Sequence, residues 1–267
     1  MKKKKPDGSV VKVRIFLSDG KEASAVSAAV IRERMVEIVL NGRRVVSVAC
    51  TGEHLEELAA GFLRSEGIVE DRKDILDLVV TADGGRVEVR VAAGKGRRVL
   101  GKKAGRTLAS SGARGVVAYE ETAAGLKKGF IGGPALTPRN VLMLMSGLLR
   151  SAKLHDATRG THCSALASPK KIIVAREDIG RHNTLDMLSG HALLKGIPAD
   201  DKVVLTTGRV SAEIIHKIRT MGVAVIISHS APTSRAVALA EECGITLIGY
   251  VRNGKMRIYA RPERIGF

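Results

Sequence analysis

The second half of the chain alternates between short apolar runs and amphipathic stretches, and this rhythm limits its possible folds more than any other feature. Four strands are predicted by the apolar runs KIIVA, KVVLTT, VAVIIS and TLIGYV. Helical spacing follows the first three runs, over residues 183–194, 211–221 and 233–243. Such repetition is typical of a mainly parallel sheet with helices packed on its faces. We therefore predict an α/β domain over residues 134–267, which opens with a helix capped by Thr137 and Pro138.

In the first half, apolar and polar residues alternate with a period of two, except in a single stretch with helical spacing. Hairpins are predicted at Asn41-Gly42 and at Asp83-Gly84-Gly85, where turn residues join apolar strands. Between them, LEELAAGFLRSEGI repeats its apolar residues at helical spacing and ends at Gly67. From residue 94 to 115, Gly, Ser, Lys and Arg dominate, which indicates a basic loop. The pattern predicts a β-rich α+β domain over residues 1–133.

The chain carries a formal net charge of +17 over 267 residues. The excess is spread along the chain, since 25 basic and 17 acidic residues precede Pro134, whereas 19 and 10 lie from Pro134 onward. This balance favours a polyanionic partner: a phosphorylated ligand, an acidic protein surface or nucleic acid. Aromatic residues make up only 3% of the chain and offer few platforms for stacking bases. We therefore do not expect a nucleic-acid partner.

Cysteine usage and hydropathy indicate a cytoplasmic protein. Cys50, Cys163 and Cys243 are far apart in the sequence and form no Cys-x-x-Cys pair, so we predict neither a disulfide framework nor a metal site. The basic start MKKKKPDGS is not followed by an apolar segment of a secretory signal. No apolar run approaches the ~20 residues that span a membrane.

Four polar stretches follow the predicted strands of the second half, at residues 176–183, 206–211, 228–234 and 251–255. In an open α/β sheet, ligands bind outside the carboxyl ends of the strands. Ser211 and Thr233 stand at predicted helix N-caps, where free backbone N–H groups attract anions. We predict a phosphorylated-ligand site whose cationic and polar side chains include Arg176, Arg181, His182, Arg209 and His229. Asp178 and Asp186 are expected to orient arginines and backbone rather than to act as acid and base.

Several separated motifs resemble the FdhD family. They are LEELAAGFLRSEGIV, GTH, REDIGRHNTLD, TTGRVSAEIIHK and SHSAPTSRAVALAEECGITLIGYVRNGKMRIYARPERI, and together they cover most of residues 40–265. The resemblance implies a role in formate dehydrogenase maturation and a cytidine-deaminase-like three-layer fold in the C-terminal domain. It also implies that the chain binds the molybdenum (or tungsten) bis-guanine-dinucleotide cofactor as cargo, with GDP as an analogue. The implied partners are the formate dehydrogenase apoenzyme, a cysteine desulfurase and a second copy of the chain.

The resemblance implies a role in cofactor binding for His162 and for the segment Tyr250, Val251, Arg252, Asn253, Gly254 and Lys255. The chain departs from the family at its persulfide loop, a Cys-x-x-Cys that corresponds to ASSGARG at residues 109–115. Ser111 and Arg114 occupy the two cysteine positions, and persulfide chemistry requires a thiolate. We therefore assign no catalytic residue. Two functions stay open: assistance in cofactor sulfuration and delivery, or cofactor binding by a chaperone without sulfurtransferase activity.

The neighbours His162 and Cys163 allow three interpretations. Cys163 could be a relocated sulfur nucleophile with His162 as its base, an incidentally reactive thiol, or a small apolar residue that fills space. We favour the last. A zinc deaminase is excluded, because its His-x-Glu and Pro-Cys-x-x-Cys ligands are missing.

Overall fold

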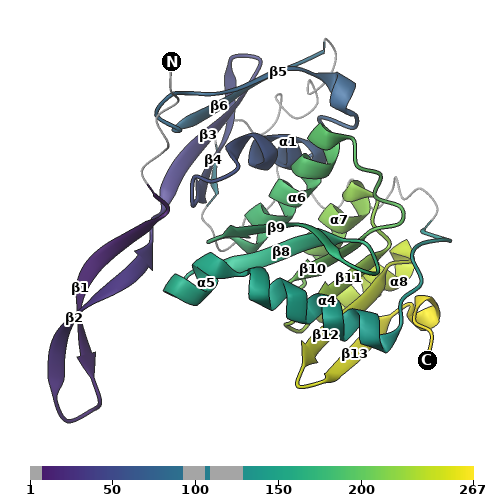
Figure 1. Cartoon of the computed structure of the whole chain (residues 1–267). Coiled ribbons are helices and arrows are strands. Elements are labelled where there is room, and N and C mark those ends of the chain that lie inside the picture. Colours follow the sequence, from purple (N-terminus) through teal and green to yellow (C-terminus); the bar gives the residue numbers. More distant parts are fainter. Residues whose placement is uncertain (1–7, 93–105, 109–128) are drawn as a thin grey trace.

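The computed structural model describes residues 8–92, 106–108 and 129–267 (Figure 1). The first half contains the strands β1 (Val10–Ser18), β2 (Ala23–Ile31), β3 (Arg34–Leu40), β4 (Arg43–Cys50), β5 (Ile75–Val80), β6 (Arg86–Val91) and β7 (Arg106–Leu108), and the helix α1 (Leu55–Ser65). The second half contains the helices α4 (Pro138–Ser151), α5 (Lys153–Thr158), α6 (Arg181–Lys195), α7 (Ala212–Met221) and α8 (Ser234–Cys243). Its strands are β8 (His162–Ala167), β9 (Ile172–Asp178), β10 (Val203–Thr206), β11 (Val225–Ser228), β12 (Thr246–Arg252) and β13 (Lys255–Ala260). Short 3₁₀ turns lie at Arg72–Asp74 and Pro262–Arg264.

The second half is built on a six-stranded sheet in the order β13-β12-β11-β10-β8-β9. Only β10, β11 and β12 are joined as parallel neighbours, because β8 is antiparallel to β10 and β13 is antiparallel to β12. The expectation of a mainly parallel sheet was therefore wrong at its edges. The strand β9 is antiparallel to β8 and thus runs in the same direction as β10. As a result, β9, β10, β11 and β12 all end at one edge of the sheet, where β8 begins.

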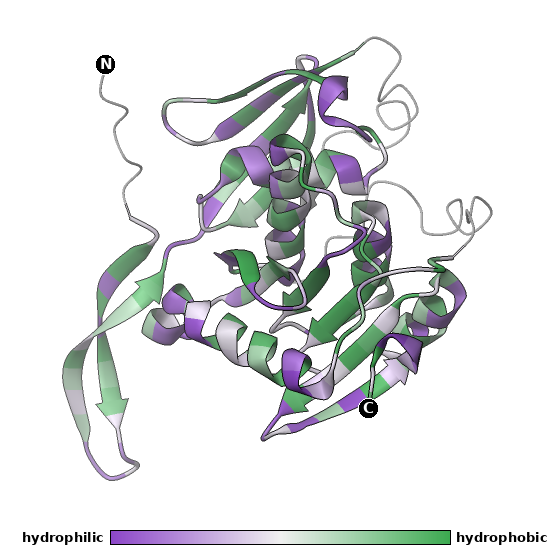
Figure 2. Cartoon of the chain, turned by 45° about the vertical axis from the view of Figure 1, so that its right-hand side comes forward, coloured by the Kyte–Doolittle hydropathy of each residue, from purple (hydrophilic) through white to green (hydrophobic). Residues whose placement is uncertain are grey.

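Helices cover both faces of this sheet and make three layers. On one face, α6, α7 and α8 bury apolar side chains against the strands. On the other face, α4 packs across β8 to β12. The strands β10 and β11 are apolar on both faces, as Figure 2 shows by their green colour. Thr137 caps α4 as predicted, since its side chain accepts a hydrogen bond from Asn140 N.

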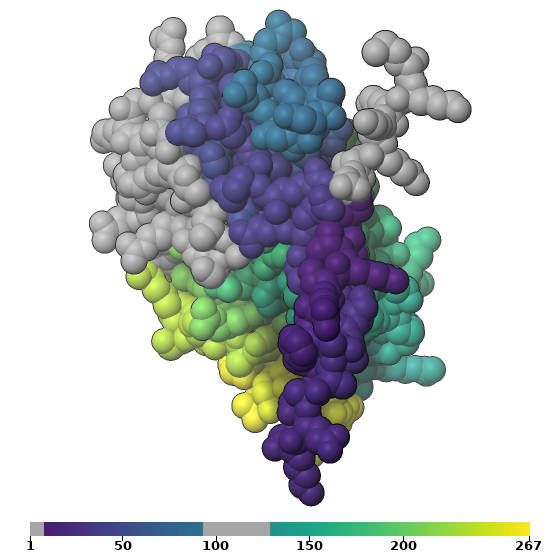
Figure 3. All heavy atoms as spheres, turned by 90° about the vertical axis from the view of Figure 1, so that its left-hand side faces the viewer, coloured from purple at the N-terminus to yellow at the C-terminus, as the bar shows by residue number. Residues whose placement is uncertain are grey.

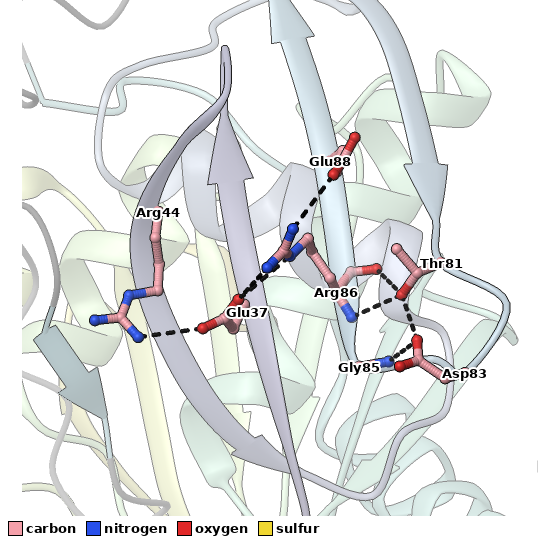
Figure 4. A network of polar contacts seen from close by, with 7 residues as sticks. All are labelled: Glu37, Arg44, Thr81, Asp83, Gly85, Arg86 and Glu88. Carbon is pink, nitrogen blue, oxygen red and sulfur yellow. Dashed lines mark hydrogen bonds and ion pairs between the residues drawn. The ribbon is translucent and has the colours of Figure 1, made fainter.

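The first half forms a second sheet in the order β5-β6-β3-β4-β7. Both predicted hairpins are confirmed, with turns at Asn41-Gly42 and at residues 81–86. On the outer face, Glu37 of β3 pairs with Arg44 of β4 and with Arg86 of β6 (Figure 4). These ion pairs are exposed and each stabilises the sheet by only about 0–1 kcal/mol. The inner face packs against α1, and Met187 and Leu193 of α6 complete this core.

The two halves meet where α1 crosses α6, and two glycines allow a close approach. A Cβ atom on Gly61 of α1 would lie 1.8 Å from the carbonyl oxygen of Asp186, and one on Gly190 of α6 would lie 1.9 Å from that of Glu57. No side chain fits in either place, so the two backbones are in direct contact. The sequence prediction identified Gly61 only as part of an amphipathic helix. The close contact that Gly61 allows also requires Gly190, which lies 129 residues later in the chain.

The predicted division at residues 133 and 134 stays a prediction. Residues just before it already contact the second half. Phe130 N donates to Cys243 O, and the Arg264 guanidinium donates to the carbonyl oxygens of Phe130 and Gly132. Most of the predicted basic loop at 94–115 lies outside the described residues. Among the helices that the structure does describe, none is both long and apolar enough to cross a membrane.

The helix crossing makes a testable prediction about stability. Gly61→Ala and Gly190→Ala force α1 and α6 apart, so we expect each to lower the free energy of unfolding by about 3 kcal/mol or more. Gly147→Ala is the matched control in the interior of α4, because its Cβ would meet only the end of the Ile172 side chain, at 3.1 Å. We expect the control to stay within about 1 kcal/mol of wild type in urea unfolding. Equal effects at all three positions would contradict the account of the crossing.

Candidate functional site

The four polar stretches predicted to share one edge of the sheet do so except for residues 253–255, which lie beyond it. The strand register places His162 opposite Asp178, Ser164 opposite Thr206, and Thr206 opposite Ser228. The start of β8 and the ends of β9, β10 and β11 are therefore level with one another. We call this region the carboxyl edge, meaning residues 161–164, 178–182, 206–211, 228–233 and 250–252. Ser211 and Thr233 are the N-caps of α7 and α8, as predicted.

Buried hydroxyl groups hold the loops of the carboxyl edge in place. Ser164 Oγ lies 2.8 Å from Thr184 Oγ1 and donates to Thr206 Oγ1 at 3.0 Å. Thr206 Oγ1 in turn accepts from Gly208 N, and Ser228 Oγ donates to Gly208 O. The sequence analysis did not single out these hydroxyls. A hydroxyl residue at the end of an apolar strand, one or two positions before a glycine, is the signal that could have found Thr206.

The loop after β10 brings two predicted arginines together. A Cβ atom on Gly208 would lie 2.9 Å from Arg181 Cβ, so this glycine lets the stem of Arg181 lie against the loop. Arg209 is exposed on the same loop. Burial, and then the positive charge of Arg209, lowers the pKa of Arg181. Two neighbouring cations provide a site that favours an anion between them.

His182 and His162 lie beside these arginines and are neutral at physiological pH. His182 is 3% exposed. Burial, followed by the positive charges of Lys217 and Arg181, lowers its pKa to about 3. The pKa of His162 is also lowered, first by burial and then by the charge of Arg181. A neutral imidazole can either donate or accept a hydrogen bond, whereas the arginines only donate.

Several buried polar atoms of the carboxyl edge have no hydrogen-bond partner within the part of the chain that the structure describes. They are Arg181 Nε, both ring nitrogens of His182, Ser211 Oγ and Arg252 Nε. Glu213 Oε2 lies 3.5 Å from His182 Nε2 without forming a hydrogen bond. Buried polar groups in folded proteins are nearly always paired, and each unpaired group costs about 1–3 kcal/mol. A polar ligand at this edge would supply the missing partners.

The segment from residue 250 to 255 divides into three parts. Tyr250 and Arg252 belong to the carboxyl edge, because Tyr250 N donates to Ser230 O and Arg252 Nη2 donates to His229 O. Val251 is 1% exposed, so its side chain belongs to the core. Asn253 and Gly254 form the two-residue turn of the β12–β13 hairpin, beyond the edge, and Lys255 begins β13.

Tyr250 has an unusual conformation. Its φ of 55° lies in the left-handed region, which a bulky side chain rarely adopts, and it coincides with a register shift between β12 and β13. The guanidinium groups of Arg252 and Arg257 lie 4.2 and 4.5 Å from the centre of its ring. Such strain is characteristic of ligand sites and costs about 1–3 kcal/mol. The ring of Tyr250 therefore lies between two guanidinium groups at the outer end of the carboxyl edge.

Arg176 serves the contact between the halves. Its Nε and Nη2 donate to the carboxylate of Glu57 on α1, at 2.6 and 2.8 Å, and its side chain is 12% exposed. His191 Nδ1 lies 2.8 Å from the same carboxylate. The role of Arg176 in binding stays a prediction, but its hydrogen-bonding capacity is largely used by Glu57.

Asp178 and Asp186 also join the halves, as orienting rather than acid–base groups. Asp178 accepts hydrogen bonds from Thr51 N, Thr51 Oγ1, Gly180 N and Asn183 Nδ2. Burial raises its pKa, and these donors act in the opposite direction by favouring the carboxylate. Asp186 accepts from Ser65 Oγ of α1 and pairs with Lys217. The expectation that the two aspartates orient arginines is corrected: their partners are backbone, hydroxyl, amide and lysine groups.

His162 and Cys163 point to opposite faces of the sheet. Cys163 is fully buried in the core beneath α4, whereas His162 lies on the face of α6, next to Arg181. Burial, and then the charge of Glu177, raises the pKa of the Cys163 thiol to about 12. A thiol with this pKa supplies almost no thiolate at neutral pH. The pair is therefore not a nucleophile with its base, and Cys163 fills space in the core.

With the His162–Cys163 pair set aside as a nucleophile and base, the described groups of the site are suited to binding a ligand. Within the described ranges, no three His, Cys, Asp or Glu side chains are grouped so that they could hold a metal ion. The positions of the family's persulfide cysteines, Ser111 and Arg114, lie outside the described residues. What the carboxyl edge offers is a set of cations, neutral imidazoles and hydroxyls, and the N-termini of α6, α7 and α8, which together suit a phosphorylated ligand.

Comparisons with known proteins found related sequences and a related structure. A model of the FdhD/NarQ family matches residues 31–266. The "Sulfur carrier protein FdhD" of Bacillus subtilis (strain 168) is 37% identical over 246 residues, which cover 91% of this chain and 93% of that protein. Its counterpart in Staphylococcus aureus (strain MRSA252) is 36% identical and covers 88% of each chain. The crystal structure of a protein described as a formate dehydrogenase accessory protein, from Desulfotalea psychrophila, superimposes with a TM-score of 0.80 at 25% identity, covering 97% of this chain and 100% of that one.

The buried imidazole of His182 predicts a pH dependence of stability. Its pKa is about 3 in the folded protein and about 6.5 when unfolded, so its contribution is complete above pH 6.5 and is lost as the pH falls toward 3. From about pH 7 to about pH 5, the free energy of unfolding should fall by about 2 kcal/mol more in wild type than in His182→Gln. Urea unfolding at the two pH values measures this difference. Equal losses in the two proteins would show that His182 is not a buried, neutral group.

Proposed function

The chain belongs to the FdhD/NarQ family, and on that premise we propose that it is an accessory protein for the maturation of formate dehydrogenase. In this role it binds the molybdenum (or tungsten) bis-guanine-dinucleotide cofactor as cargo and assists its sulfuration and delivery. The apoenzyme is the partner that receives the cofactor. The three separate, buried cysteines suit a reducing compartment, so we assign this role to the cytoplasm.

The unpartnered polar atoms of the carboxyl edge carry the proposal. Arg181, His182, Ser211 and Arg252 bring buried donors and acceptors to one place, and they come from three different strand ends. Diphosphate oxygens would accept from the arginines and from the N-termini of α6 and α7. A guanine base has donors and acceptors for the imidazoles. These residues therefore fit the chemistry of a guanine dinucleotide.

This fit redefines the roles of four residues in the binding set. We retain His162, Arg181, His182, Arg209, Tyr250 and Arg252 as side-chain contacts, and we assign Val251 a backbone role only. A ligand would contact Asn253, Gly254 and Lys255 only if it extended beyond the carboxyl edge. The three-layer arrangement of the second half supports the similarity to cytidine deaminases, which we keep as a proposal about the scaffold.

Binding of GDP to Arg209→Ala tests the site. Arg209 is exposed, so its removal should leave the fold intact and weaken GDP binding about tenfold or more, as expected for loss of a charge-assisted hydrogen bond. Arg90→Ala is the matched control, since it removes an equally basic, exposed side chain from β6. Titration calorimetry compares the three proteins. The proposal fails if wild type does not bind GDP at millimolar concentration, or if Arg90→Ala weakens binding as much as Arg209→Ala.

The alternative function is a cofactor-binding chaperone without sulfurtransferase activity. The specific observation in its favour is that Ser111 and Arg114 stand at the positions of the persulfide cysteines, while Cys163 is buried with a pKa of about 12. A cysteine desulfurase would then have no thiol to load at the family's usual position.

Cys163→Ala separates the two functions. Because this thiol only fills space, we expect the variant to support maturation of formate dehydrogenase at the wild-type level, in cells that lack their own accessory protein. Its free energy of unfolding should fall by less than about 1.5 kcal/mol. Loss of maturation with unchanged GDP binding and stability would instead assign sulfur transfer to Cys163.

A further inference from the structure

Glu213 is an acidic side chain beside the cations of the carboxyl edge. It is the second residue of α7, which the N-cap Ser211 precedes. Its side chain is 37% exposed, so its carboxylate can meet a ligand. In the described part of the chain, its one partner within ion-pair distance is His182, whose Nε2 lies 3.5 Å from Oε2 and makes no hydrogen bond. Because His182 is neutral at physiological pH, this contact does not neutralise the carboxylate.

Three other acidic side chains at this end of α6 are already used within the protein. Asp178 accepts four hydrogen bonds. Asp186 accepts from side chains of α1 and α7. Glu177 accepts from two backbone N–H groups at the start of α5. Of these four acids, Glu213 is the one whose oxygens accept no hydrogen bond from the residues that the structure describes.

The position of Glu213 works against the binding of a phosphate alone. Burial and then the charge of Arg209 lower the pKa of Arg181, and Glu213 acts in the opposite direction, so Arg181 lies within electrostatic range of both. A carboxylate this close to the two arginines weakens their attraction for an anion. The helix dipole favours an acidic residue in the first turn of any helix and does not explain one at this place in particular. A carboxylate here favours a ligand that brings hydrogen-bond donors together with its phosphates.

We propose that Glu213 hydrogen-bonds to the guanine base of the ligand and makes the site specific for guanine nucleotides. The inference rests on the proposed function, because it names the residue that selects the base of the nucleotide. The arginines of the carboxyl edge only donate hydrogen bonds, so they suit the diphosphate but cannot accept from a base. Glu213 supplies an exposed acceptor beside them.

The chemistry of the bases explains why a carboxylate selects guanine. The Watson–Crick edge of guanine carries two adjacent donors, N1–H and the 2-amino group, and a carboxylate offers two acceptor oxygens to match them. Adenine has a lone pair at N1, which would face the negative charge of the carboxylate. A site that pairs with the donors of one base therefore rejects a base that lacks them.

Titration calorimetry of the full chain with three nucleotides tests the proposal. We expect wild type to bind GDP about tenfold or more tighter than ADP, with inosine diphosphate, which lacks the 2-amino group, between them. Glu213→Gln should weaken GDP binding about tenfold or more, because an amide matches only one of the two donors. The same variant should bind ADP at least as tightly as wild type does, because a negative charge beside the diphosphate is removed.

Xanthosine diphosphate provides a reciprocal test. Its 2-oxo group is an acceptor where guanine has the 2-amino donor, so wild type should bind it weakly. The carboxamide of Glu213→Gln can accept from N1–H and donate to the 2-oxo group. We therefore expect this variant to bind xanthosine diphosphate about tenfold more tightly than wild type. A variant that had only lost its fold would not gain affinity for any nucleotide.

Glu56→Gln is the matched control. Glu56 is an exposed acid at the second position of α1, as Glu213 is at the second position of α7. It belongs to the first half of the chain, which Figure 3 shows in purple and blue, mainly above the green and yellow second half apart from the two-stranded arm of β1 and β2. We expect Glu56→Gln to bind all four nucleotides as wild type does.

The results that would overturn the proposal differ from those that would overturn the proposed function. Equal affinities of wild type for GDP and ADP would refute base selection and leave nucleotide binding in place. Equal changes in GDP and ADP affinity in Glu213→Gln, or the same changes in Glu56→Gln, would show that Glu213 acts only through its charge. If wild type binds none of the four nucleotides, both the proposed function and this inference are wrong.

Discussion

The backbone contact between α1 and α6 is the constraint on which the rest of the structure depends. Gly61 and Gly190 bring the two helices together without side chains between them. Around this crossing, polar contacts join the halves: Glu57 with Arg176, Ser65 with Asp186, and Thr51 with Asp178. Buried polar contacts are strongly directional, so they fix one relative placement where an apolar interface alone would tolerate several. The N-terminus of α6, and with it Arg181 and His182, is held in position by this interface.

Along the carboxyl edge, residues whose polar groups are available to a ligand alternate with residues whose polar groups are bonded within the protein. Asp178 is saturated with donors from both halves, whereas Arg181 and His182, three and four residues later, retain buried atoms without partners. The hydroxyls of Ser164, Thr206 and Ser228 are used inside the protein and leave the loop around Arg209 free to meet a ligand. A site prepared in this way loses little conformational freedom on binding, which favours affinity.

Local signals in the sequence predicted local structure well. Apolar periodicity located α1 and the strand–helix repeats, and Asn41-Gly42 marked a hairpin, because these patterns act between near neighbours. The same dipeptide at residues 253–254 was interpreted as part of a binding segment, although it turns β12 into β13. Strand direction at the sheet edges, and the pairing of Arg176 with Glu57 across 119 residues, depend on tertiary contacts that no local pattern encodes.

The central claim is that the carboxyl edge, positioned by the helix crossing, binds a guanine nucleotide. Hydrogen–deuterium exchange with and without GDP tests it most directly, because it reports on each backbone segment in the intact protein. The account predicts slower exchange at residues 180–183, 207–211 and 229–231, with little change in β3 and β6. Protection confined to the first-half sheet, or none at saturating GDP, would contradict it.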